Sequence, residues 1–232
     1  MKRALICVSL LLLVFTKSTS AQSTIVKLNS IRDADSIAAI QYVYPHFQNG
    51  RVFFINKGIT PGKLNYSRVN GEILFNNNGQ ILALNKLETV EKVTIAKDTF
   101  LVSPLGGFVK QISVYPAVSL VQASRVRFLD RERKVAFGNH SSISSARGVV
   151  TLPGTENNDL RTKVDENLSF VLTDTYYLLT PSKRLTELNE KDFLLAYPNH
   201  KKQLKAYMSN TKIDFNDLED LNKLLLFAQS LN

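Results

Sequence analysis

The sequence predicts an α+β fold in which an antiparallel β-meander, as an open sheet or a partly closed barrel, precedes a C-terminal helical segment. Between residues 51 and 129, short runs rich in β-branched and aromatic residues alternate with turns that contain glycine or asparagine. Beyond residue 181, apolar residues recur at spacings of three and four, which is the period of a helix. Strands first and helices last are typical of α+β proteins.

The first 21 residues have the three parts of a secretory signal peptide. A basic head, Met1–Arg3, precedes twelve largely apolar residues at 4–15, and a small polar segment ends at Ala21. The apolar run is shorter than the roughly 20 residues that a membrane-spanning helix needs, although a retained anchor is the alternative. We therefore expect cleavage near Ala21 and an exported protein, periplasmic or extracellular, with no transmembrane span in the mature chain.

Cleavage would remove the only cysteine, Cys7, and leave 211 residues (232 − 21) that form no disulfide. The histidines His46, His140 and His200 lack the spacing of a local zinc motif, and no cysteine remains to assist them. We expect no metal or other cofactor, and a core stabilised by packing alone. An exported chain without disulfides is typical of the bacterial envelope.

The β-rich domain is expected over residues 22–180. Its first part, 22–48, allows two interpretations: Asp33–Ser36 begins a short helix, or the stretch forms an edge strand. Asn70-Gly71 and Asn76–Gly79 then supply the positive φ angles of tight hairpins. A long loop rich in serine and glycine is expected near 137–156. The expected β segments are 52–55, 63–67, 72–75, 81–84, 90–95, 99–102, 109–129 and 168–180.

The last segment, residues 181–232, is expected to be helical and to pack on the sheet. Asn189 would cap a first helix that Pro198 ends, and Asn199 would cap a second. A capping box at Asn216–Glu219 would open a third helix, whose face carries Leu218, Leu221 and Leu225.

The most basic stretch runs from residue 110 to 147, with seven cations against two acids. Arg125 and Arg127 are two residues apart and would share one face of a strand. Such a face could bind an anionic envelope component, such as lipopolysaccharide phosphate, an acidic glycan or a membrane surface; the alternative is a solvated face paired with local acids. Nucleic acid is not expected, because the chain is exported and no stacking aromatics interleave with the arginines. The predicted surface comprises Arg125, Arg127, Arg131, Arg133 and Lys134.

Two other functions stay open from the sequence. A hydrolase could assemble a site from distant residues, with His140, Ser141 and an acid from 148–180, although no G-x-S-x-G elbow is present. A structural subunit of an envelope complex is the other alternative, with another envelope protein as its partner. The favoured interpretation is a non-enzymatic binding or accessory module.

Seven runs occur in a characteristic order: Phe47–Phe54, Lys63–Tyr66, Ile81–Leu84, Val93–Phe100, Lys134–Gly138, Tyr176–Leu179 and Tyr207–Leu221. Together they resemble an uncharacterised family of secreted proteins from Bacteroidota. The resemblance implies export and a β-rich body with a helical tail. It implies no activity, ligand or catalytic residue.

Overall fold

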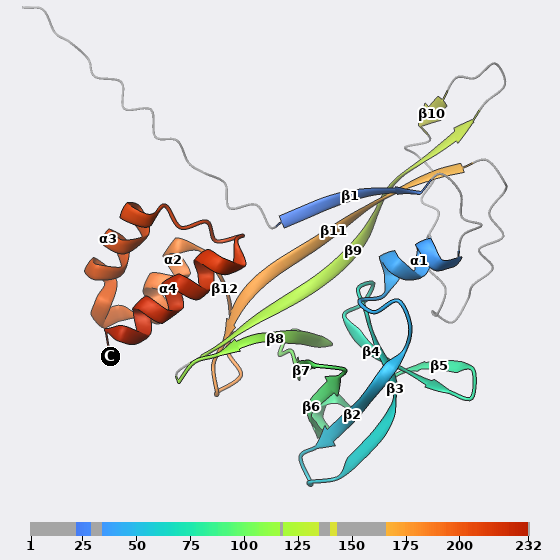
Figure 1. Cartoon of the computed structure of the whole chain (residues 1–232), viewed down its shortest axis with the longest axis horizontal. Helices are drawn as coiled ribbons and strands as arrows, with labels where there is room; N and C mark the ends of the chain where they lie inside the picture. Colours follow the sequence, from blue (N-terminus) through green and yellow to red (C-terminus); the bar gives the residue numbers. More distant parts are fainter. Residues whose placement is uncertain (1–21, 29–33, 117, 135–139, 143–165, 232) are drawn as a thin grey trace, which may run out of the picture.

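A computed structural model describes residues 22–28, 34–116, 118–134, 140–142 and 166–231. It confirms the α+β class, with one antiparallel sheet of twelve strands and C-terminal helices (Figure 1). The sheet is open, not a closed barrel. The predicted signal peptide lies outside the described residues, as does the predicted loop apart from residues 140–142. None of the helices in the described ranges is long and apolar enough to cross a membrane.

Eight of the strands form two successive antiparallel meanders. The second meander does not continue from the edge of the first, because β6 pairs with β2 instead of β5. The expected single meander is therefore two, joined through their first strands. Each strand overlaps an expected β segment, although β8 and β9 divide the single expected segment 109–129 and β9 extends beyond it to Lys134. The bounds are Gln48–Phe54 (β2), Ile59–Ser67 (β3), Glu72–Asn77 (β4), Gln80–Ala83 (β5), Val90–Ile95 (β6), Asp98–Val102 (β7), Phe108–Val114 (β8) and Ser119–Lys134 (β9), with a 3-10 helix at Leu87–Thr89 (η1).

A long hairpin of β9 and β11 (Glu166–Leu179) runs through the molecule (Figure 1). The outer edge of β11 is lined by β1 (Gln22–Leu28) and by the short strand β12 (Leu185–Glu187). The far end of β9 pairs with β10 (His140–Ser142). The first part of the domain thus contains both an edge strand, β1, and a helix, α1 (Ala34–Gln41).

The C-terminal helices pack on one end of this hairpin. Leu120 and Leu178 pair across β9 and β11 and are fully buried against the helices. From the helical side, Leu204, Leu221 and Leu225 are at most 1% exposed. Burial of each such leucine contributes roughly 1.5–3 kcal/mol. The helices are α2 (Glu190–Ala196), α3 (Lys201–Thr211) and α4 (Leu218–Ser230), with a 3-10 turn at Pro198–His200 (η2).

Of the three helix caps that the sequence predicted, the structure confirms one. Asn189 caps α2, and its side chain accepts from the Asp192 N–H. Asn199 is not a cap, because the 3-10 turn places His200 before α3. The cap of α4 is Asp217, one residue later than expected, and its carboxylate accepts from the Asp220 N–H. Neighbouring polar residues compete for such positions, so the sequence locates a helix start better than its cap.

The β3–β4 turn folds back onto β8 and β9. The Phe108 N–H donates to the Gly71 carbonyl at 2.7 Å, and the Val126 N–H donates to the Arg68 carbonyl at 3.0 Å. The approach needs glycine at residue 107, since a Cβ there would lie 2.5 Å from the Gly71 oxygen. Gly106 and Gly107 thus lie in the turn between β7 and β8, and this turn packs against the β3–β4 turn.

Substitution of Gly71 tests this close approach, with Gly79 as the matched control. Both residues have positive φ (71° and 91°), so alanine at either costs about 1 kcal/mol in backbone strain. A Cβ on Gly71 would also lie 2.3 Å from the Arg125 guanidinium and would displace it from the Tyr66 hydroxyl, whereas nothing lies within 4 Å of one on Gly79. We expect G71A to lower the free energy of unfolding by about 3 kcal/mol, and G79A by about 1, in urea titrations. Equal losses would mean that the turn does not pack closely.

Candidate functional site

Arg125 is enclosed by the fold. Its Nη1 donates to the Tyr66 hydroxyl at 2.5 Å and to the Ser124 carbonyl at 3.0 Å, and its guanidinium covers Gly71. The half-buried side chain therefore joins β9 to the end of β3. These contacts give Arg125 a structural role that the sequence pattern did not indicate.

The polar groups around Arg125 form a connected junction. Tyr66 is 1% exposed, and its hydroxyl donates to the Phe108 carbonyl at 3.1 Å. Burial raises the pKa of Tyr66, while the positive charge of Arg125 opposes the rise. Nearby, the Arg68 Nη1 donates to the carbonyls of Ala39 (2.9 Å) and Tyr42, so it binds the C-terminal end of α1. Burial lowers the pKa of Arg68, and the Asp174 carboxylate opposes this.

Arg127 is the exposed member of the predicted pair. The pairing of Arg125 with Thr173 and of Arg127 with Val171 places both arginines on one face, as expected. The register then shifts by one residue beside Ser169 and Phe170, so this alternation does not continue to 131 and 133. The side chains of Arg131, Arg133 and Lys134 lie outside the described part. A polyanion-binding role for this face stays a prediction.

The residues of the alternative hydrolase lie at the far end of β9. His140 pairs with Lys134, and Ser141 with Arg133, across β10 and β9. Their side chains lie outside the described part, as do the acids between 148 and 165. Among the described residues, no group of three or more His, Asp or Glu side chains is placed to hold a metal ion.

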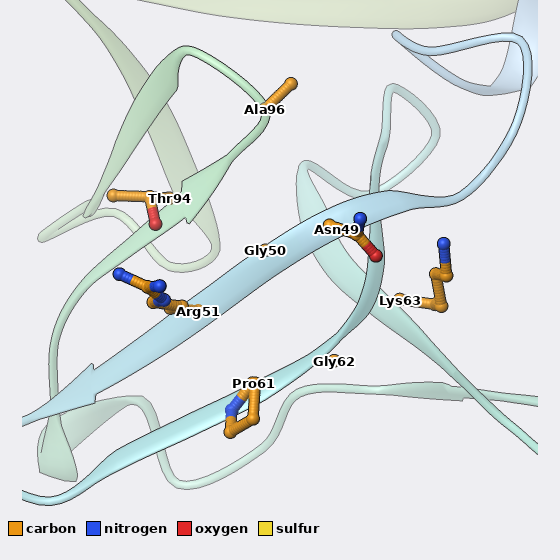
Figure 2. A pocket seen from close by; sticks show the side chains of 8 residues that line it. All are labelled: Asn49, Gly50, Arg51, Pro61, Gly62, Lys63, Thr94 and Ala96. Carbon is orange, nitrogen blue, oxygen red and sulfur yellow. The ribbon is translucent and has the colours of Figure 1, made fainter.

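A basic depression of about 610 Å³ lies on the outer face of β2, β3 and β6 (Figure 2). The sequence reasoning missed it, because it forms only when three strands come together. No histidine or carboxylate is among the side chains around it, so it provides no general base. The depression is lined by Asn49, Gly50, Arg51, Pro61, Gly62, Lys63, Thr94 and Ala96.

Two glycines form the floor of the basic depression. Gly50 of β2 pairs directly with Gly62 of β3. A Cβ on Gly50 would lie 2.5 Å from the Thr94 carbonyl and 2.7 Å from Leu64 Cδ1, so no other residue fits there. Leu64, which is 2% exposed, fills the space beneath from the core. Glycines within β-type runs were the sequence signal that could have indicated this close packing.

The walls of the basic depression are positively charged. Arg51 and Lys63 are exposed, and neither makes an ion pair or side-chain hydrogen bond with another described residue. Figure 2 shows Arg51 beside Thr94 on one side of the floor, with Lys63 on the other and Asn49 between. Guanidinium and ammonium groups form charge-assisted hydrogen bonds with phosphate, sulfate or carboxylate. The arrangement can therefore hold an extended anionic ligand.

The structural role of Arg125 is tested against Arg127 on the same strand face. We expect R125A to lower the free energy of unfolding by about 2 kcal/mol, because the buried Tyr66 hydroxyl loses its charged partner. R127A removes an exposed charge and should change the free energy of unfolding by less than about 0.5 kcal/mol. Urea unfolding followed by circular dichroism measures both. A loss for R127A as large as that for R125A would contradict this assignment.

No protein-family model matches the chain, and neither a curated protein nor a solved structure shows significant similarity to it. The resemblance to secreted Bacteroidota proteins accordingly stays a prediction. What the protein can bind follows from the geometry and charge of its own surface.

Proposed function

We propose that the protein is an exported, non-enzymatic binding module of the bacterial envelope whose ligand is an anionic envelope component. The observation that carries this proposal is the basic depression, where two exposed cations without described partners flank a glycine floor. The signal-peptide pattern of residues 1–21 supports export. Anionic phosphate and carboxylate groups are the chemistry that such a surface recognises.

The strands make the basic depression rigid before any ligand arrives. Arg51 and Lys63 project from paired strands, so binding orders only their side chains and not the backbone. Because both side chains are exposed, their attraction for anions is screened by salt. The net charge of +6 that remains after Lys2, Arg3 and Lys17 leave (9 − 3) would steer an anionic partner toward the protein. Affinity should therefore depend on several contacts along an extended ligand.

The face of β9 that carries the exposed Arg127 is a second candidate surface for the same class of ligand. It lies on β9, away from the three strands of the basic depression, so variants can separate the two surfaces. The hydrolase and the structural subunit stay predictions from the sequence.

Binding of the mature protein to dextran sulfate, a soluble polyanion, tests the proposal. We expect R51Q/K63Q to weaken binding about tenfold and to flatten its salt dependence, since two cations near the ligand are lost. The matched control K201Q/K202Q removes the same charge from the exposed surface of α3. It should bind within about twofold of the parent protein. Isothermal titration calorimetry at two salt concentrations measures both.

Two other results of this experiment would contradict the proposed site. Equal weakening by R51Q/K63Q and K201Q/K202Q would mean that only net charge matters, and would overturn the site. Weakening by R127Q alone would move the site to β9, as the sequence predicted.

A further inference from the structure

The turn between β2 and β3 presents two isoleucines to solvent. Ile55 is 59% exposed and Ile59 is 56% exposed, and Lys57 lies between them. Single exposed apolar residues are common on proteins. Here the two isoleucines flank one turn, and Lys57 lies at its apex. They form an apolar tip on a projecting hairpin (Figure 1). We call residues 54–59 the hairpin tip.

Four backbone N–H groups of the hairpin tip donate hydrogen bonds. The Phe54 N–H donates to the Gly58 carbonyl and the Lys57 N–H to the Phe54 carbonyl, both at 2.9 Å. The Gly58 N–H donates to the Asn56 side chain at 3.0 Å. The Ile55 N–H donates to the carbonyl of Thr89, the last residue of η1, at 2.9 Å. These bonds lower the cost of bringing the tip into an apolar medium, where a free N–H is expensive.

Cations follow the apolar tip along the same outer face. Ile59 pairs with Phe53, which pairs with Lys92 of β6, and the Lys92 ammonium lies 5.3 Å from the Phe53 ring centroid. Arg51 and Lys63 come four residues behind Ile55 and Ile59, or about 13 Å along a strand. Arg51 and Lys63 thus lie behind the isoleucines, as lipid phosphates lie above the acyl chains, and the long Lys57 side chain at the apex can extend back toward the same phosphates.

The charge of the hairpin is uniformly positive. Residues 48–63 contain Arg51, Lys57 and Lys63 and no acid. The nearest carboxylates along the adjoining segment, Glu88 and Glu91, are exposed, and their charge limits insertion to the interfacial region. An acidic glycan would engage the cations and leave the two isoleucines in water. A membrane surface uses both sets of side chains.

We propose that the hairpin tip inserts Ile55 and Ile59 into the interface of an anionic lipid bilayer while Arg51, Lys57 and Lys63 bind its phosphate groups. This inference deepens the proposed function and rests on it for the role of Arg51 and Lys63. It commits the anionic partner to a lipid surface. The phosphate could otherwise belong to a soluble polyanion, and the experiment separates the two sources.

The chain contains no tryptophan, so one introduced residue gives an unambiguous fluorescence signal. We expect the emission of I55W to shift to shorter wavelength with vesicles of equal parts phosphatidylcholine and phosphatidylglycerol. It should not shift with phosphatidylcholine alone or with dextran sulfate. The control L226W places tryptophan at an equally exposed site, 59%, on α4 and should not shift. A shift of L226W without one of I55W would overturn the inference.

Co-sedimentation with the same vesicles gives an independent readout. We expect I55T/I59T to reduce partitioning about tenfold, because two apolar side chains no longer leave water. The control L195Q/L226Q removes two exposed leucines of the C-terminal helices and should leave partitioning unchanged. I55T/I59T should bind dextran sulfate like the parent, which also shows that it folds. If vesicle binding needs Arg51 and Lys63 but not the isoleucines, the inference fails and the proposed function stands. If I55W shifts while R51Q/K63Q binds dextran sulfate normally, the proposed function fails instead.

Discussion

The packing of the first meander, β2–β5, against β8 and β9 depends on the buried hydroxyl of Tyr66. It donates to the carbonyl of Phe108 on β8 and accepts from Arg125 on β9, while its ring stacks on Phe100 at 5.2 Å. The turn that follows Tyr66 places Arg68 against the end of α1 and Gly71 against β8. Tyr66 thus joins the first meander to β8 and to the long hairpin, and Arg68 in the turn after it joins α1 to them. Satisfied polar networks of this kind specify a single arrangement.

The junction also separates the basic side chains into two kinds. Arg68 and Arg125 are surrounded by carbonyl and hydroxyl oxygens and hold the fold together. Arg51 and Lys63 extend into solvent from paired strands and are available to a ligand. Net charge counts all four alike. Only the partners of each side chain show which charges can act on another molecule.

Apart from β10, which lies in the expected loop, and β12, which lies in the expected helical segment, the strands and the C-terminal helices followed from the sequence, because turn residues such as Asn70-Gly71 and the helical spacing of Leu221 and Leu225 act locally. The pairing of β6 with β2 did not, since it joins segments about 40 residues apart and no local pattern records it. Spacing placed Arg125 on the correct strand face, yet it could not show that Tyr66 and Gly71 would cover it. The basic depression was missed for the same reason, as its parts belong to three strands.

The position of β1 has a consequence for the order of folding. Its seven residues pair with β11, in a register from Gln22 with Asp174 to Leu28 with Leu168, so about 140 to 150 residues separate the partners. Contacts this distant in sequence form slowly, because the loop between them must first close. The edge of the sheet therefore stays incomplete until most of the chain has been synthesised. Under the proposed export, this delay would keep the chain unfolded for longer, and its sheet would be completed only after β11 has emerged.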